Sequence, residues 1–138
     1  MKVAFGTDEH TALTDAVRTD LESRGHTVVA VDDGQWVEVG HAVGELVATG
    51  GCDTGVLFCW TGTGASIAAN KVRGVRAALC TDAATAAGAR TWNDANVLVM
   101  GLRLTSPEVA GEMLDAWFAT AVDPEETEVI SSVEAGRG

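Results

Sequence analysis

Five short, largely apolar runs recur along the chain, and a longer segment with helical features follows each of them. The apolar runs occupy residues 2–7, 27–31, 55–59, 75–79 and 96–100. They are apolar almost throughout instead of alternating with polar residues, which is typical of parallel strands that are covered on both faces.

The segments that follow these runs predict helices. In the first, Leu13, Val17 and Leu21 recur at helical spacing. In the last, Ser106 is a good N-cap and Pro107 suits the first helical position. The predicted helices cover residues 11–24, 39–49, 65–71, 82–92 and 107–119.

The alternation of five strands with five helices predicts the fold class. It is typical of a three-layer α/β/α sandwich around a five-stranded parallel sheet, a Rossmann-like fold. The pattern does not give the order of the strands. We expect one α/β domain over residues 1–120.

The last segment, residues 121–138, differs from the rest of the chain. It carries five acidic residues and one basic residue, and its apolar positions are confined mainly to Val129, Ile130 and Val133. We interpret it as an acidic C-terminal tail that either packs on a partner subunit or is disordered.

The charge balance excludes two classes of partner. Nine Lys and Arg residues stand against twenty Asp and Glu residues, a formal net charge of −11. Such a field repels phosphate backbones and anionic lipid headgroups, so we expect neither nucleic acid nor a membrane as partner. No apolar run reaches membrane-spanning length, and the N-terminus turns polar at Thr7 and Asp8, which predicts a cytoplasmic protein.

The cysteines and histidines indicate neither a disulfide framework nor a metal site. Cys52, Cys59 and Cys80 form no CxxC pair, and the three histidines are far apart in the sequence. We expect three free thiols. In the absence of other signals, each is interpreted as a small buried hydrophobic residue.

The segment that follows the third predicted strand has the features of an anion-binding loop. Ligands of open parallel sheets bind at the carboxyl ends of the strands. There, the glycines of Thr61-Gly62-Thr63-Gly64 would let successive N–H groups point into one concavity at the positive end of a helix. Cys59 precedes this loop, and the positive end of the helix predicted there leads us to expect that it can act as a thiolate. A thiolate base beside such a loop suits removal of a proton α to a carbonyl and stabilisation of the enediolate.

Other loop chemistries fit this segment less well. It lacks the GK[ST] ending of a P-loop and the third glycine of a dinucleotide fingerprint, and the chain contains no GxSxG motif. We therefore expect no nucleotide cofactor and no serine nucleophile.

Three runs of the sequence resemble one known family. They are CWTGTGASIAANK at 59–71, GVRAA at 74–78 and NDANVL at 93–98, and residues 3–8 and 101–117 fit the same pattern in the same order. The pattern is similar to that of the ribose-5-phosphate isomerase B and galactose-6-phosphate isomerase family, over about residues 2–119.

The resemblance implies an aldose–ketose isomerase without metal or cofactor, acting on a carbohydrate as a homodimer or homotetramer whose sites are shared between subunits. It implies that Cys59 moves a proton between C1 and C2 through a cis-enediolate and that Thr61 assists opening of the sugar ring. The implied binding groups are the backbone N–H groups of Gly62, Thr63 and Gly64 for the enediolate, and Asp8 and Asn93 for substrate hydroxyls.

The chain departs from the family pattern at several positions around this site. Glu9 and Trp92 stand where the family has histidine, His10 is displaced by one position, and Trp60 replaces a glycine. The basic C-terminal segment that grips the substrate phosphate has no counterpart. We therefore expect a substrate altered from ribose 5-phosphate, an uncharged polyol or a sugar with an apolar or cationic group, bound by Glu9, Trp60 and Trp92.

Two alternatives stay open at this point. If the substrate carries a phosphate, the cations available to hold it are His10, Arg90 and Arg103. The chain could also be a sugar-binding protein without activity, or a lyase or epimerase that uses the same enediolate chemistry.

Overall fold

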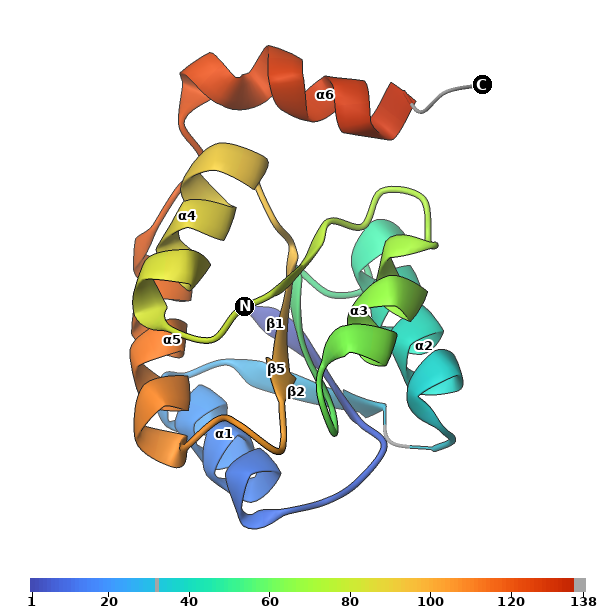
Figure 1. Cartoon of the computed structure of the whole chain (residues 1–138), viewed down its shortest axis with the longest axis vertical. Helices are drawn as coiled ribbons and strands as arrows, with labels where there is room; N and C mark the ends of the chain where they lie inside the picture. Colours follow the sequence, from blue (N-terminus) through green and yellow to red (C-terminus); the bar gives the residue numbers. More distant parts are fainter. Residues whose placement is uncertain (32, 136–138) are drawn as a thin grey trace.

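The computed structural model describes residues 1–31 and 33–135, and parallel strands alternate with helices along it (Figure 1). The strands are β1 (Lys2–Thr7), β2 (Thr27–Val31), β3 (Thr54–Cys59), β4 (Ala77–Leu79) and β5 (Val97–Gly101). The helices are α1 (Ala12–Ser23), α2 (Trp36–Ala48), α3 (Thr63–Asn70), α4 (Ala83–Asn93), α5 (Pro107–Ala119) and α6 (Thr127–Ala135), with a 3₁₀ turn, η1 (Pro124–Glu126), before α6.

The sheet is fully parallel, and its strand order is β2-β1-β3-β5-β4. The helices cover both of its faces, with α1, α4 and α5 on one side and α2 and α3 on the other (Figure 1). The predicted three-layer α/β/α sandwich is therefore confirmed.

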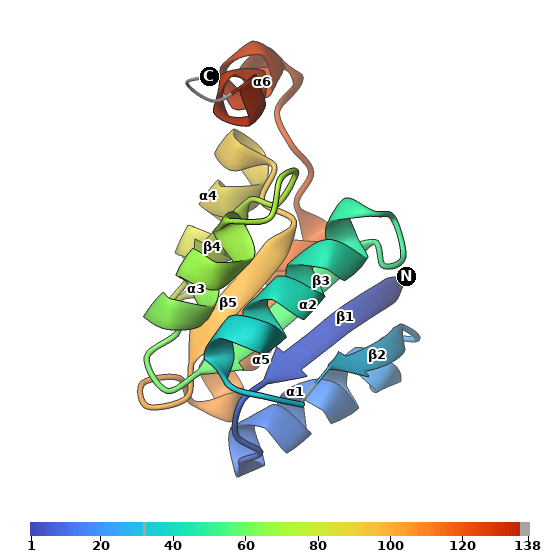
Figure 2. The ribbon, with the colours of Figure 1, turned by 90° about the vertical axis from the view of Figure 1, so that its right-hand side faces the viewer.

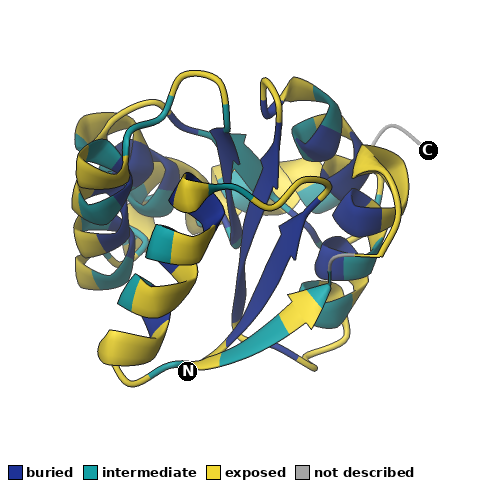
Figure 3. Cartoon of the chain, turned by 90° about the horizontal axis from the view of Figure 1, so that it is seen from below, coloured by how far each residue is buried: buried dark blue, intermediate teal, exposed yellow. Residues whose placement is uncertain are grey.

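Each face of the sheet has its own core, because successive strand residues point to opposite sides. In β3, Val56 and Phe58 pack toward α1, α4 and α5, whereas Leu57 and Cys59 pack toward α2 and α3. The central strands β1, β3 and β5 are buried almost throughout (Figure 3). The expectation of strands covered on both faces thus holds at the centre of the sheet.

The two edge strands differ from that expectation. Residues of β2 and β4 are half-buried or exposed, because each edge strand has a hydrogen-bonded neighbour on one side only. The short β4 also begins at Ala77, two residues later than the apolar run predicts. The backbone of Ala77 is held there by the side chain of Asn70, whose amide bonds both the N–H and the C=O of that residue.

Side-chain caps fix the starts of three helices. Thr11 and Thr14 form a reciprocal capping box at α1, Asp82 accepts from Thr85 N at α4, and Ser106 accepts from Val109 N at α5. Helix α5 has the bounds that the sequence predicts. Helices α2 and α3 have no side-chain cap, and they begin three and two residues earlier than predicted.

The segment interpreted as an acidic tail contains a helix. α6 crosses above the end of α4 (Figures 1 and 2), and no residue of it is fully buried. Glu134 bonds both Arg76 and the N–H of Gly74. This anchor comes from residues about 60 positions away in the sequence, so the local apolar pattern does not show it. Residues 136–138 of the predicted tail lie outside the described residues.

Across the described part of the chain, every helix is too short or too polar to cross a membrane.

Candidate functional site

The candidate site lies where the carboxyl ends of β1 and β3 meet. The two strands are neighbours, with Thr7 beside Phe58. The chain leaves β1 toward α1 on one face of the sheet and leaves β3 toward α3 on the other (Figure 1). Such a point, where successive connections diverge, is the usual ligand site of an open α/β sheet.

An open cavity of about 310 Å³ occupies this point. It brings together residues from the β1 end, the start of α2 and the β3–α3 connection. The lining residues are Asp8, Trp36, Cys59, Trp60, Thr61, Thr63 and Gly64.

Cys59 lines this cavity as the last residue of β3. It is 5% exposed, and it packs in the core between the sheet and helices α2 and α3. Its carbonyl accepts a 2.9 Å hydrogen bond from Leu102 N, which ties the strand end to the connection after β5. The position of the thiol is therefore set by the sheet and not by a flexible loop.

Gly62 makes the sharp turn from β3 into α3. Its φ of 78° is in the left-handed region, and a Cβ at this position would lie 2.5 Å from Leu79 Cδ1 and 3.1 Å from the carbonyl carbon of Met100. Glycine is thus required here both by conformation and by space.

The first turn of α3 borders the same cavity. Its first intrahelical bond runs from Ser66 N to Gly62 O, so the N–H groups of residues 63–65 have no partner within the helix. The positive end of the helix dipole lies at these groups. Thr63 and Gly64 of the predicted loop therefore lie in the first turn of a helix that starts at Thr63, and binding of an anion there stays a prediction.

Two hydroxyl groups stand at the mouth of the cavity. Thr61 Oγ1 and Thr63 Oγ1 are 2.7 Å apart and hydrogen-bonded to each other. Both side chains are exposed, so a bound ligand can exchange this bond for one of its own.

Trp36 lines the candidate site, which the sequence pattern does not predict. Its indole lies on Gly64, where an added Cβ would come within 2.8 Å of the ring. It reaches this place because α2 begins at residue 36, three residues earlier than predicted. The signal available in the sequence was the pair of an aromatic residue before α2 and a glycine at the start of α3. Trp60, on the same cavity, is 57% exposed.

The three residues after β1 differ in their relation to the cavity. Asp8 lines it, whereas Glu9 and His10 are exposed and are not among the lining residues. The turn is held by Thr7, whose hydroxyl donates to Glu9 O at 2.6 Å and accepts from Glu9 N at 3.2 Å.

Trp92 and Asn93 do not meet Cys59 within one chain. They are the last residues of α4, which leads into the start of β5. The start of β5, Val97, lies beside Gly55, whereas Cys59 lies beside Gly101 at the other end of that strand. Four residues of strand separate the two ends, about 13 Å at 3.3 Å per residue. Both side chains are exposed and border surface hollows next to β4, away from the Cys59 cavity.

The two arginines that could hold a substrate phosphate, Arg90 and Arg103, lie at different ends of the sheet. Arg90 lies at the amino end of the sheet, where it bonds Asp94, Ala95 O and Thr120 O. It therefore does not face the Cys59 cavity. Arg103 is exposed, and its N–H donates to Trp60 O at 2.9 Å, which places its backbone next to the candidate site.

The other two cysteines are in environments that suppress their ionisation. Burial raises the pKa of Cys80 to about 11 and also raises the pKa of Cys52. All three cysteines are buried free thiols, as predicted. Of the three, Cys59 is the one that lines the cavity at the β1 and β3 ends.

Among the described residues, no group of three or more His, Cys, Asp and Glu side chains is placed to hold a metal ion.

Comparison with known proteins gives a consistent result. The family model described as Ribose/Galactose Isomerase matches residues 3–133. Ribose-5-phosphate isomerase B of Escherichia coli is 36% identical over 149 aligned positions, which cover 99% of this chain and 98% of that protein. Galactose-6-phosphate isomerase subunit LacB of Clostridium acetobutylicum is 38% identical over 123 positions, 83% of this chain and 70% of the relative.

A solved structure supports the same relationship. Ribose-5-phosphate isomerase B of Clostridium thermocellum superposes with a TM-score of 0.92 at 32% identity, covering 98% of this chain and 96% of that one.

Proposed function

The chain belongs to the ribose/galactose isomerase family of sugar-phosphate isomerases, and on this premise we propose that it interconverts an aldose and a ketose through a cis-enediolate with Cys59 as general base. One observation carries the proposal. The Cys59 thiol and the first turn of α3 border the same cavity at the carboxyl end of the sheet. A base and a set of donors for a developing oxyanion are thus adjacent.

The proposed reaction uses proton transfers only. The Cys59 thiolate takes the proton from C2 of the open-chain aldose, and the electron pair of that C–H bond forms the C1=C2 bond while O1 becomes an oxyanion. The N–H groups of Thr63 and Gly64 stabilise that charge. The thiol then returns its proton to C1, and a proton moves from O2 to O1, which leaves the ketone at C2.

Two further residues have roles in this scheme. Thr61, whose hydroxyl is hydrogen-bonded to that of Thr63, exchanges a proton with the ring oxygen when the sugar opens in this scheme. Asp8 lines the same cavity and, in this scheme, binds substrate hydroxyls. Both roles follow the family resemblance.

Asn93 fits this scheme only if two copies of the chain share each site. Within one chain it lies at the far end of β5 from Cys59. We therefore propose a homodimer or homotetramer in which Trp92 and Asn93 of one subunit complete the cavity of another. The 61% exposure of Trp92 supports such a contact, because a large apolar side chain at the surface gains by burial.

The proposed substrate departs from ribose 5-phosphate. The cavity presents two indoles, Trp36 and Trp60, together with the carboxylate of Asp8. Glu9 follows Asp8, and the chain as a whole carries a net charge of −11. This environment suits an uncharged polyol or a sugar with an apolar or cationic group better than a dianion.

Solvent exchange tests the reaction. Tetroses, pentoses and hexoses, each with and without a terminal phosphate, are incubated with the protein in D₂O and followed by NMR. Isomerised product with deuterium at the α-carbon is the expected result. Binding without exchange would identify a non-catalytic sugar-binding protein, and exchange with loss of a leaving group would identify a lyase.

A matched pair of substrates that differ only in the phosphate tests how the far end of the substrate is bound. We expect the phosphorylated member to have no large advantage. If it is preferred by about a hundredfold or more, and Arg103→Ala abolishes the preference while Arg18→Ala does not, the substrate is a phosphate ester held by Arg103.

A further inference from the structure

The turn that follows α4 has an unusual backbone at Asp94. Its φ is 45°, and it is the one non-glycine residue among the described residues with a positive φ. A side chain in the left-handed region is strained unless its surroundings hold it there. This turn directly follows Asn93. In the proposed function, Asn93 binds hydroxyl groups of the substrate.

The side chain of Arg76 binds the backbone carbonyls of this turn. Its Nε donates to Asn93 O at 3.1 Å and to Asp94 O at 2.9 Å. Its own N–H donates to Asn96 Oδ1 at 2.7 Å, and its carbonyl accepts from Asn96 N at 2.9 Å. The residue that precedes β4 is therefore bonded to Asn93 and Asp94 on one side of the turn and to Asn96 on the other.

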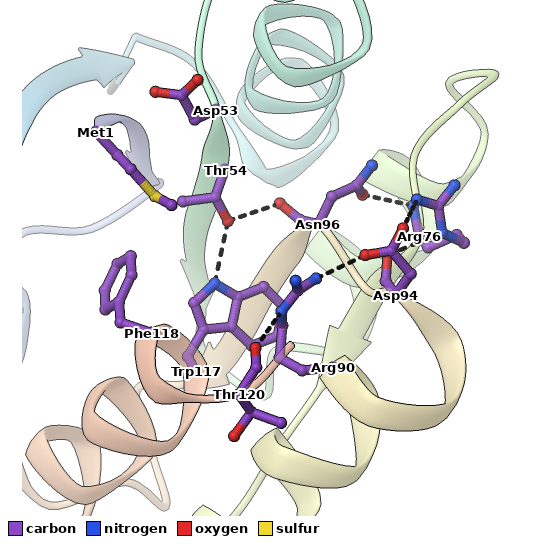
Figure 4. A pocket seen from close by; sticks show the side chains of 10 residues that line it. All are labelled: Met1, Asp53, Thr54, Arg76, Arg90, Asp94, Asn96, Trp117, Phe118 and Thr120. Carbon is purple, nitrogen blue, oxygen red and sulfur yellow. Dashed lines mark hydrogen bonds and ion pairs between the residues drawn. The ribbon is translucent and has the colours of Figure 1, made fainter. Parts of the chain in front are cut away.

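A second arginine grips Asp94 from the opposite side (Figure 4). Arg90 Nη1 donates to Asp94 Oδ1 at 3.0 Å, while Arg76 Nη2 lies 3.5 Å from Asp94 Oδ2. The two carboxylate oxygens thus face different guanidinium groups. Because the Arg76 and Asp94 side chains are 19% and 39% exposed, solvent screens these contacts only partly.

Arg76 also carries the anchor of α6. Glu134 Oε1 accepts from Arg76 Nη1 at 2.5 Å, and Glu134 Oε2 accepts from Gly74 N at 3.2 Å. One guanidinium therefore joins the C-terminal helix to the turn behind Asn93. A lysine could not reproduce this arrangement, because its ammonium lacks the planar fork of donors.

From these contacts we propose that Arg76 is a positioning residue for the isomerase site. It fixes the backbone of Asn93 and Asp94, so that the Asn93 side chain is presented in one direction. Because Arg76 also bonds Glu134, the conformation of this turn depends on the docking of α6. The proposal rests on the proposed function, in which Asn93 completes the site of a second copy.

Kinetics with a matched control test the role. Arg76→Met removes the fork, whereas Arg24→Met removes a similar fork that joins Asp20 of α1 to Asp115 of α5. We expect Arg76→Met to raise KM about 10- to 100-fold, as small misplacements of a binding group do. Arg24→Met should lower Tm and leave KM unchanged.

A double-mutant cycle separates positioning from general destabilisation. If Arg76 acts through Asn93, then Arg76→Met in the Asn93→Ala background should raise KM no further. Glu134→Gln, which folds more safely because it keeps an oxygen acceptor, should raise KM in the same direction by less. An equal effect of Arg76→Met with and without Asn93 would overturn the proposal.

Amide hydrogen exchange gives a readout that does not need turnover. Faster exchange at residues 91–95 in Arg76→Met, but not in Arg24→Met, is expected. Unchanged exchange at these residues would overturn the proposal even for an active enzyme. A wild-type protein inactive on every sugar would overturn the proposed function, and with it the link to catalysis, whatever the exchange rates.

Discussion

At the scale of single residues, the chemistry depends on where each thiol lies. Cys59 and Cys80 are both buried, yet Cys59 ends a strand at a cavity, whereas Cys80 is enclosed in the core beside α4 and α5. The same residue type thus has a proposed catalytic role at one position and a packing role at the other.

Replacing the proposed base should abolish turnover without unfolding the protein. Cys59→Ala puts a small apolar residue in a site that packs in the core, so its Tm should stay close to that of the wild type. Loss of a general base lowers kcat on the order of 10²–10⁴-fold. Isomerase assays beside Cys52→Ala and Cys80→Ala make the comparison, and full activity of Cys59→Ala would refute the assignment.

The buried Cys80 thiol should make the protein sensitive to alkali. Its pKa is raised to about 11 in the folded state, so an unfolded chain loses this proton at lower pH than the folded one. The contribution to stability is complete below about pH 9 and is lost as the pH rises toward about 11.

Urea unfolding at several alkaline pH values measures this effect. The chain has no Tyr, which removes one competing titration. The free energy of unfolding of the wild type should fall more steeply with pH than that of Cys80→Ala. Parallel curves for the two proteins would contradict the prediction.

At the scale of elements, the starts of α2 and α3 shape the cavity. α3 begins at Thr63 and presents its free N–H groups, while α2 begins at Trp36 and lays the indole on Gly64. The two helices pack closely together, with Gly40 of α2 so near Ala68 that a Cβ at Gly40 would lie 2.8 Å from it.

Two neighbouring substitutions at the start of α2 distinguish an effect on substrate binding from an effect on the helix itself. Trp36→Ala removes a wall of the cavity, whereas Val37→Ala changes the next residue of the same turn, with 37% exposure against 39% for Trp36. We expect Trp36→Ala to raise KM about tenfold or more, in line with the loss of an aromatic contact. Similar KM values for the two variants would show that Trp36 does not contact the substrate.

At the scale of the whole molecule, the length of β5 separates Cys59 from Asn93. Cys59 is at the carboxyl end of the sheet and Asn93 at the amino end, so a second copy is needed if both are to serve one substrate. Light scattering should therefore show a dimer or tetramer at assay concentrations.

Mixing two defective variants tests the shared site directly. Cys59→Ala lacks the base at every site, and Asn93→Ala lacks a binding group at every site, so both homodimers should turn over slowly at substrate concentrations well below KM. A mixed dimer has one site with both groups intact. After dissociation and random reassociation, activity should return to roughly a quarter of the wild-type value, as the symmetry of a two-site dimer requires. Absence of any recovery would mean that the two residues act in the same subunit or not in the same site.

Much of this molecule follows from its sequence. The apolar runs located all five strands. For β1, β3 and β5 the reason is that strands at the centre of a parallel sheet are covered on both faces, whereas β2 and β4 are edge strands and are only half-buried. The order of Cys59, Thr61 and the glycines identified the candidate base and oxyanion loop, because these groups are neighbours along the chain and take their geometry from one strand–helix turn.

Only the tertiary structure decided the rest. Trp36 lines the cavity beside Gly64, Arg90 bonds Thr120 O at the other end of the sheet, and Glu134 of α6 bonds Arg76. Each of these contacts joins residues that are far apart in the sequence. Periodicity reports how a segment presents its own faces, and it carries no information about which distant segment meets them. The strand order β2-β1-β3-β5-β4 supplies that information, since it determines which loops share each end of the sheet.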